Sequence, residues 1–384
     1  MVSIVANGRR LRELTVLASL GLVAVSCGTS VDTPSEIQPT APPSAIEGPL
    51  VDPEEIVAGG VPPDGIPPID DPRFLEPARV RFLAPQEPVV SVEVNAIAKA
   101  YPVRILMWHE IVNDDFDGVP VVVTYCPLCN TGIAFLRPII HGELLDFGTS
   151  GKLYRSNLVM YDRQTNSFWP QALGQAVVGP LLGEELEPVP TRLLSWADWR
   201  QAHPDGLVLS TRTGHRRDYG SNPYAGYEDA ERPFLFAGEP DPRLPPTEHV
   251  LGVSDTATIA FPYSELERLS SEGVTAVHRT VGGKRLVVLW KAGTVSALDA
   301  AQIPMSADVG AAAAYEPRVG TRRLTFVVRE GTFVDEQTGS RWTIAGDAID
   351  GPLDGRRLEV AVALDSFWFA WAAFHPETAI YRAA

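Results

Sequence analysis

The sequence predicts an α+β, β-rich fold built from two similar units, each a small sheet or half-barrel closed by a C-terminal helix. Short apolar and β-branched runs bounded by Gly, Asn or Asp predict strands, as at residues 121–125, 132–135 and 153–161. A helix is predicted near residue 200, because Trp196 and Trp199 lie three residues apart and Pro204 ends the pattern. An internal repeat predicts that the fold contains two such units.

The N-terminal residues 1–26 predict a lipoprotein signal peptide. Arg9, Arg10 and Arg12 precede an apolar stretch that is too short to span a bilayer as a mature helix. The residues before Cys27 resemble a bacterial lipobox, in which the cysteine carries the lipid. We therefore expect an extracytoplasmic protein that is lipid-anchored to the cell membrane through Cys27. An ordinary secretory signal cut nearby is the alternative.

Residues 27–72 are rich in proline and acidic residues and contain no Lys or Arg, a composition that predicts a solvated tether. The whole chain has 32 Lys and Arg against 48 Asp and Glu, a formal net charge of −16. Nucleic-acid binding draws its affinity from clustered Lys and Arg, so this charge argues against a nucleic-acid partner. No later run of apolar residues is long enough to predict a membrane span.

The internal repeat relates two long stretches of the chain. Residues 162–169 resemble residues 335–342 at an offset of 173, and the offset becomes 172 further along. At that offset Trp196, Trp199, His203 and Pro204 correspond to Trp368, Trp371, His375 and Pro376. The repeat predicts a first unit at 73–210, an inter-unit join at 211–247 and a second unit at 248–384. We expect His203 and His375 in the last helical turn, where a partly charged imidazole suits the helix dipole.

The first unit alone contains a cysteine pair, Cys126 and Cys129, which follows a predicted strand. Two thiols separated by two residues can form a disulfide, act as a redox pair or hold a metal. A structural zinc site needs four ligands, commonly two such pairs, and this chain has one. The spacing therefore leaves three interpretations: an inert disulfide, thiol redox chemistry, or a site for copper or a similar soft metal.

Several other residues could complete a site around the thiols. His109 lies just before the cysteine strand and could be the base that lowers a thiol pKa, a third metal ligand or a buried core histidine. Glu110 or Asn113 could orient His109. Met160 offers a thioether to Cu(I), although a methionine in a strand usually packs in the core. In the join, residues 213–219 and 224–227 could line the mouth of a cleft, or form a solvated loop.

These motifs together resemble those of domain-of-unknown-function family 3179. The resemblance rests on residues 108–114, 125–132, 147–154 and 158–163, and it extends from about Asp64 to the C-terminus. It implies a secreted bacterial or archaeal protein and implies no established activity. It also implies that some relatives carry selenocysteine in place of a cysteine of this pair, which favours redox chemistry but leaves copper binding open.

The leading hypothesis is a lipoprotein with one thiol redox site, at which Cys126 and Cys129 act as attacking and resolving thiols. His109 would be the base and Glu110 or Asn113 its orienting partner. The alternatives are a copper-binding module that uses Cys126, Cys129, His109 and Met160, and a binding or structural protein with an inert disulfide. The sequence identifies neither the redox partner nor the small-molecule substrate.

Overall fold

The structure is a computed structural model that describes residues 48–383, apart from Glu231. These residues belong to one compact unit, which is β-rich with few helices, so the predicted class is confirmed at that level. The described helices are short: α1 (Val103–Leu106), α2 (Trp196–Ala202), α3 (Tyr263–Arg268) and α4 (Trp368–Phe374). Single 3₁₀ turns lie at η1 (Pro53–Glu55), η2 (Pro77–Arg79), η3 (Pro127–Cys129), η4 (Tyr227–Asp229) and η5 (Ile303–Met305).

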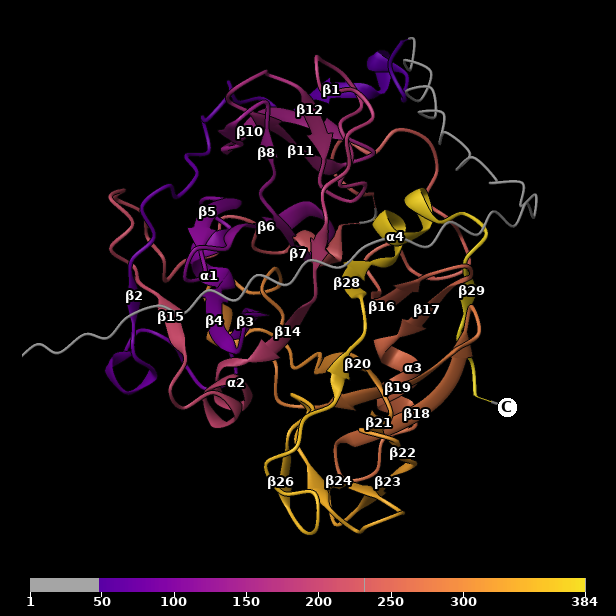
Figure 1. Ribbon diagram of the computed structural model, residues 1–384. Helices are drawn as coiled ribbons and strands as arrows, with labels where there is room; N and C mark the ends of the chain where they lie inside the picture. Colours follow the sequence, from indigo (N-terminus) through magenta and orange to yellow (C-terminus); the bar gives the residue numbers. More distant parts are fainter. Residues whose placement is uncertain (1–47, 231, 384) are drawn as a thin grey trace, which may run out of the picture. The chain divides into compact units, whose positions relative to one another are not determined.

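The first half of the body contains three larger sheets and one small hairpin (Figure 1). One sheet has the order β14 (Thr191–Ser195), β3 (Pro88–Val94), β4 (Ile97–Pro102), β15 (Leu207–Leu209) and β2 (Phe74–Leu75). The second has the order β13 (Pro188–Val189), β7 (Thr131–Leu136), β6 (Pro120–Cys126) and β5 (Ile111–Asp115). The third has the order β1 (Ile56–Ala58), β10 (Phe147–Tyr154), β11 (Asn157–Asp162) and β12 (Phe168–Pro170), and β8 (Ile139–Ile140) pairs with β9 (Glu143–Leu144).

The second half also contains three larger sheets and one hairpin. The first sheet has the order β28 (Ala363–Phe367), β16 (His249–Ser254), β17 (Thr258–Pro262) and β29 (Ala379–Ile380). The second has the order β18 (Val274–Val281), β19 (Lys284–Lys291), β20 (Ala311–Glu316) and β27 (Glu359–Val360). The third has the order β23 (Phe326–Arg329), β24 (Thr332–Asp335), β25 (Arg341–Trp342) and β26 (Ala348–Asp350), and β21 (Arg318–Val319) pairs with β22 (Arg322–Arg323).

The two halves use the same strand order. The sequence β14-β3-β4-β15 in one half corresponds to β28-β16-β17-β29 in the other, and in each the last strand of the order pairs in parallel. A helix follows the second strand of each hairpin, and a second helix precedes the parallel strand. Each of these sheets has two edge strands, and no pairing closes one into a barrel within residues 48–383. The expected half-barrels are therefore not seen.

A buried aspartate organises the same loop in both halves. Asp162 accepts hydrogen bonds from the backbone N–H of Thr165 (2.6 Å) and from Trp169 Nε1 (3.0 Å). Asp335 accepts the equivalent bonds from Thr338 (2.7 Å) and from Trp342 Nε1 (3.0 Å). Both aspartates are completely buried, and these bonds replace the water that their oxygens lose on folding. The repeated Asp-x-x-Thr motif is thus a loop-capping device.

The helices near the ends of the two units are also equivalent. The Trp196 and Trp199 rings stack at 5.7 Å in α2, and both side chains are buried. His203 and His375 cap the C-termini of α2 and α4, as expected. The expected partial charge is wrong: burial, with Arg192 and Arg357 nearby, lowers the pKa of His203 to about 3, and burial lowers that of His375. Both imidazoles are therefore neutral at pH 7.

Part of the expected tether belongs to the folded body. Residues 56–58 form strand β1, which pairs with β10, and Ile69 is 1% exposed within the main apolar cluster. Asp64 pairs with Arg163, and Asp70 accepts a hydrogen bond from Asn113. The boundary at residue 72 is therefore wrong, because the acidic side chains find basic and amide partners that composition alone does not reveal. Residues 27–47 of the expected tether lie outside the described residues.

We predict that Asp162→Ala and Asp335→Ala each lower the free energy of unfolding by about 3 kcal/mol or more, because each leaves several buried donors without an acceptor. The matched control is Glu336→Ala, which removes an exposed carboxyl beside Asp335 and should change stability by less than about 0.5 kcal/mol. Urea unfolding of the three variants measures the difference. Equal effects of Asp335→Ala and Glu336→Ala would contradict the capping role.

Candidate functional site

The cysteine pair lies on the turn that connects two central strands. Cys126 is the last residue of β6, Pro127 begins the 3₁₀ turn η3, and Cys129 ends it. Asn130 then adopts a left-handed conformation with φ of 50°, which asparagine tolerates better than most residues. The chain reverses into β7, so Cys126 pairs with Thr131. This tight reversal places both sulfur atoms on the same side of one turn.

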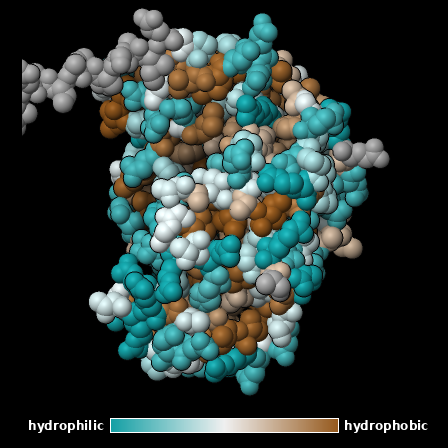
Figure 2. All heavy atoms as spheres, turned by 90° about the vertical axis from the view of Figure 1, so that its right-hand side faces the viewer, coloured by the Kyte–Doolittle hydropathy of each residue, from teal (hydrophilic) through white to brown (hydrophobic). Residues whose placement is uncertain are grey.

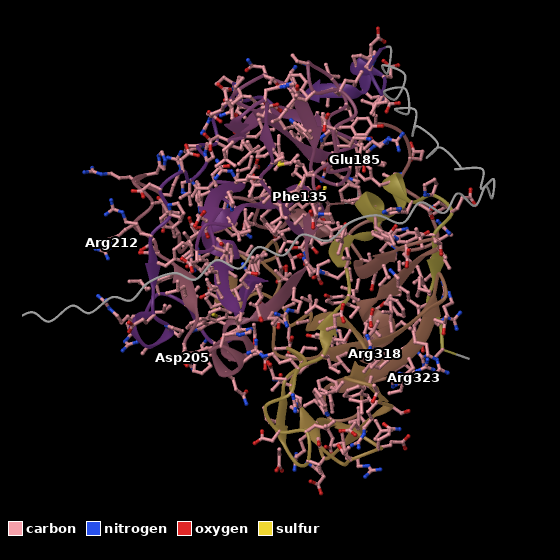
Figure 3. The ribbon with its side chains drawn as sticks, in the orientation of Figure 1. Phe135, Glu185, Asp205, Arg212, Arg318 and Arg323 are labelled. Atoms are coloured by element: carbon pink, nitrogen blue, oxygen red, sulfur yellow. The ribbon has the colours of Figure 1, made fainter. Side chains whose placement is uncertain are left out.

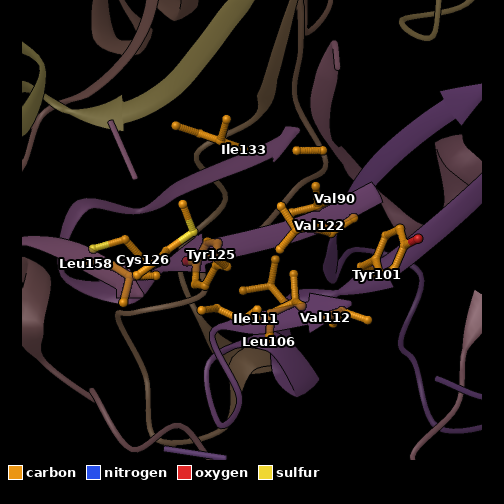
Figure 4. Close-up of a cluster of buried hydrophobic side chains, with 14 of the residues drawn as sticks. Val90, Tyr101, Leu106, Ile111, Val112, Val122, Tyr125, Cys126, Ile133 and Leu158 are labelled. Carbon is orange, nitrogen blue, oxygen red and sulfur yellow. The ribbon is translucent and has the colours of Figure 1, made fainter. Parts of the chain in front are cut away.

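Both cysteines are free thiols and both are buried, with 2% of Cys126 and 1% of Cys129 exposed. The turn between β10 and β11 lies against them: the Ser156 carbonyl oxygen is 3.5 Å from Cys129 Sγ and 3.9 Å from Cys126 Sγ. Asn157 Nδ2 lies 3.6 Å from Cys129 Sγ, to which it donates. Figure 4 shows Cys126 beside Tyr125 and Leu158 in an apolar cluster. Water therefore has little access to either sulfur.

Glu110 is the buried carboxyl group that affects the pKa of the Cys126 thiol. Its backbone has a φ of 59°, between helix α1 and strand β5, and its side chain is buried. Burial is the only cause of its pKa shift, which raises the pKa from 4.5 to about 8. Burial first, then Cys129 and then Glu110 raise the pKa of the Cys126 thiol well above its usual range. The carboxyl thus disfavours ionisation of this thiol.

The inter-unit join covers the thiols with tyrosines. Burial and the proximity of Glu110 and Cys126 raise the pKa of Tyr224, and burial and both cysteines raise the pKa of Tyr227. The Tyr227 hydroxyl is buried without a hydrogen-bond partner among the described residues. Ser156 Oγ donates to the backbone oxygen of Phe234, which holds the join against the β10–β11 turn. At residues 224–227 the two tyrosines are half-buried against the cluster that contains the cysteines, and Ala225 and Gly226 between them are exposed.

A hydrogen-bonded chain links the cysteine turn to the second half. Tyr125 Oη donates to Asn130 Oδ1 (2.7 Å), and Asn130 Nδ2 contacts His249 Nδ1 (3.1 Å). His249 Nε2 contacts Glu228 Oε1 (3.1 Å). The amide can only donate to Nδ1, so the imidazole proton lies on Nε2 and points to the carboxylate. The position of the cysteine turn therefore depends on residues more than 100 positions further along the chain.

His109 is not brought to the sulfur atoms by any described contact. Its Nδ1 bonds the Pro67 carbonyl oxygen (2.7 Å) and its Nε2 bonds the Tyr219 hydroxyl (2.7 Å). Burial lowers its pKa to about 4, so the ring is neutral at pH 7. Both ring nitrogens are occupied, as in the third interpretation of the sequence, a buried core histidine. Asn113 does not orient it, because its amide bonds Asp70 and the backbone of Phe147.

The metal interpretation gains no support from the described side chains. Among residues 48–383, no group of three or more His, Cys, Asp and Glu side chains is placed to hold a metal ion. Met160 is completely buried in β11, where it pairs with Trp169 in β12, as expected for a core methionine. Cys27 lies outside the described residues. No described helix is long and apolar enough to cross a membrane.

Sequence reasoning identified Cys126, Cys129 and Glu110, and the stretch 224–227 that contains Tyr227, but missed Asn157 and His249. Asn157 lies at the start of β11, Tyr227 in the join and His249 at the start of β16 in the second half. Asn157 and His249 carried no motif of their own in the sequence. Tyr227 belonged to an aromatic cluster in the join, and that cluster was the one available signal.

We predict that Glu110 makes the protein less stable as the pH rises between about 4.5 and about 8. In this range the unfolded chain has released the proton that the folded carboxyl still holds, so the free energy of unfolding falls. Glu110→Gln should flatten this dependence, and Glu143→Gln, an exposed control, should retain it. Urea unfolding from pH 5 to pH 8 measures the slopes. A parallel slope for Glu110→Gln and the parent protein would refute the assignment.

Comparison with family models supplies the one match to known proteins. Residues 63–378 match the model of a protein family of unknown function, DUF3179. Comparisons with curated proteins and with solved structures gave no significant match. The matched range includes the cysteine turn, Glu110, the join and all the strands of both halves except β1 and β29. The chain therefore belongs to the DUF3179 family.

Proposed function

We propose that this protein carries out thiol–disulfide exchange through Cys126 and Cys129, with Glu110 as the proton carrier. The observation that supports this most is a buried carboxyl with a raised pKa whose charge acts on Cys126, one of two free thiols on one turn. A carboxyl with a pKa of about 8 can both take and return a proton near neutral pH. A merely structural thiol pair has no need of such a group.

The exchange proceeds in two steps that balance atoms and electrons. The Cys129 thiol attacks, as its thiolate, one sulfur of a substrate disulfide and forms a mixed disulfide, and the other substrate sulfur leaves and takes up the proton that Cys129 released. The Glu110 carboxylate then accepts the Cys126 proton, and the Cys126 thiolate attacks Cys129 Sγ. The second substrate thiolate leaves, the Cys126–Cys129 disulfide forms, and the substrate disulfide has gained two electrons. Cys129 is assigned the first attack because Asn157 donates to its sulfur.

Burial affects both the reduction potential of the cysteine pair and the access of a substrate to its sulfur atoms. A thiol whose pKa is raised is a poor leaving group, so the Cys126–Cys129 disulfide would resist reduction and the dithiol would be a strong reductant. The substrate must also reach sulfurs that are at most 2% exposed. We therefore propose that the segment carrying Tyr227 and Phe234 moves aside, or that the substrate is a small disulfide.

Two further proposals concern the whole chain. The basic N-terminus, the short apolar stretch and the lipobox-like residues support a lipid anchor on Cys27 and an extracytoplasmic location. The shared strand orders and the paired Asp162 and Asp335 loops support descent of the two halves from one duplicated unit. In this view the first half kept or acquired the thiols, and the second half packs against the turn that carries them.

The thiol proposal is tested by trapping the mixed disulfide with a glutathione disulfide substrate. Cys126→Ser should accumulate glutathione on Cys129, whereas Cys129→Ser should not form a stable adduct. Glu110→Gln should also accumulate the adduct, because resolution near pH 8 slows by about 100-fold or more without the base. Quenching with an alkylating agent followed by mass spectrometry measures each species, and Glu143→Gln is the control.

Three outcomes would overturn the proposal. Stoichiometric copper in the purified protein, lost on Cys126→Ser, would make this a metal-binding module. A disulfide that no reductant opens before the fold unfolds would make the pair structural. Adduct levels in Glu110→Gln equal to those of the parent protein would remove Glu110 from the mechanism.

We predict that Cys27→Ala moves the protein from the membrane fraction to the soluble fraction of a bacterial host, because an unlipidated chain loses its anchor. Metabolic labelling with a palmitate analogue, followed by fractionation, measures the change. Cys126→Ser is the matched control and should remain labelled and membrane-bound. Equal labelling of Cys27→Ala and the parent would show that the lipid is attached elsewhere.

A further inference from the structure

A large basic pocket lies in the second half, away from the cysteine turn. It has a volume of about 970 Å³ and is formed by the β18–β19 hairpin, the end of β20 and the β21–β22 hairpin. Five of its lining residues are cationic and one is acidic, in a chain whose net charge is −16. The cationic residues are Arg279, Lys284, Arg285, Arg318 and Arg323. The pocket is therefore positively charged, although the protein as a whole is acidic.

Two of these arginines face each other at an energetic cost. Arg318 in β21 is the direct cross-strand partner of Arg323 in β22, as their common location in Figure 3 illustrates. Like charges opposite one another destabilise a two-stranded ribbon. Glu316 lies 3.5 Å from Arg318 and offsets part of this repulsion, and Arg323 has no ion pair among the described residues. An anion between the two guanidinium groups would remove the repulsion.

Most of the pocket's positive charge is not neutralised by the protein. Lys284 pairs with Asp255 at 2.8 Å, but that pair is exposed to solvent and contributes little. Arg279, Arg285 and Arg323 make no ion pair within the described residues. Figure 2 shows hydrophilic and hydrophobic side chains interspersed on the face that corresponds to the right-hand side of Figure 1, where β18 lies. Three free guanidinium groups therefore remain available to a ligand.

The wall behind these side chains is ordered by backbone hydrogen bonds. The Leu324 N–H donates to the Pro317 oxygen (2.9 Å), and the Phe326 N–H donates to His278 Nε2 (2.8 Å). Burial and Arg285 lower the pKa of His278, so the acceptor nitrogen stays unprotonated at pH 7. Thr325 N–H donates to Gln337 Oε1 (2.6 Å). A fixed wall lowers the entropic cost of ordering a ligand against it.

We propose that this pocket binds a phosphate-bearing ligand with at least two negative charges. Guanidinium groups form paired, charge-assisted hydrogen bonds with phosphate oxygens, and several arginines together match a multiply charged group better than a single carboxylate. The volume admits a ligand larger than phosphate alone. The phosphate is carried either by a free small molecule or by a lipid headgroup. The site is independent of the thiol pair.

The test measures binding of inorganic pyrophosphate by calorimetry at low ionic strength. Arg285→Ala combined with Arg323→Ala should raise the Kd by about tenfold or more, which corresponds to about 1.4 kcal/mol, because charge-assisted contacts with the phosphate are lost. The matched control is Arg322→Ala combined with Arg329→Ala, which removes the same charge from exposed residues outside the pocket. The control and Cys126→Ser should bind pyrophosphate as the parent protein does.

A second arm distinguishes the source of the phosphate. Sedimentation of the unlipidated protein with phosphatidylglycerol vesicles measures its binding to a lipid headgroup. Phosphatidylcholine vesicles are the control. Vesicle binding that the pocket variant loses and the control keeps would place the phosphate on a lipid. Pyrophosphate binding without vesicle binding would indicate a free ligand. Absence of both, or equal loss in the pocket and control variants, would overturn the proposal.

Discussion

Desolvation around the Cys126–Cys129 turn is the physical constraint behind the unusual chemistry of this region, and it raises the pKa of the Cys126 thiol well above its usual range. The turn lies under the β10–β11 turn on one side and under the join on another, so its thiols lose water. The same burial raises the pKa values of Glu110, Tyr224 and Tyr227. A shared loss of solvent, with few compensating hydrogen bonds, makes this region the most chemically unusual part of the first half.

The two halves differ in the residue that ends one pair of corresponding strands. The central strand β6 ends at Cys126, and its counterpart β19 ends at Lys291. Lys291 pairs with Asp198 of helix α2, so the second half uses that end of its strand for an ion pair that crosses to the first half. The same backbone position therefore carries a buried thiol in one half and an ion-paired lysine in the other. The halves also share apolar clusters: Val287 and Tyr315 pack with Trp199.

The distribution of charge divides the molecule in a second way. The folded body is acidic, yet the β18–β19 and β21–β22 hairpins carry arginines with few partners. Elsewhere the buried cations are matched: Lys99 pairs with Asp114, and Arg104 pairs with Glu87. Buried charges require partners because desolvation is expensive, whereas exposed ones do not. The arginines without ion pairs thus line the pocket, where solvent or a ligand can compensate their charge.

The sequence alone determined the β-rich class, the helices ending at His203 and His375, the repeated Asp162 and Asp335 motif and the cysteine turn. Each depends on local spacing, on a short motif or on turn chemistry, which neighbouring residues specify. Only the tertiary structure decided that the charge of Glu110 acts on the Cys126 thiol, that His109 instead bonds Pro67 and Tyr219, that Tyr227 packs against the cluster containing the cysteines and that residues 56–58 join the body. Those outcomes depend on contacts between distant segments and on the burial that they create, and burial, which sets pKa values, is a property of the packed chain.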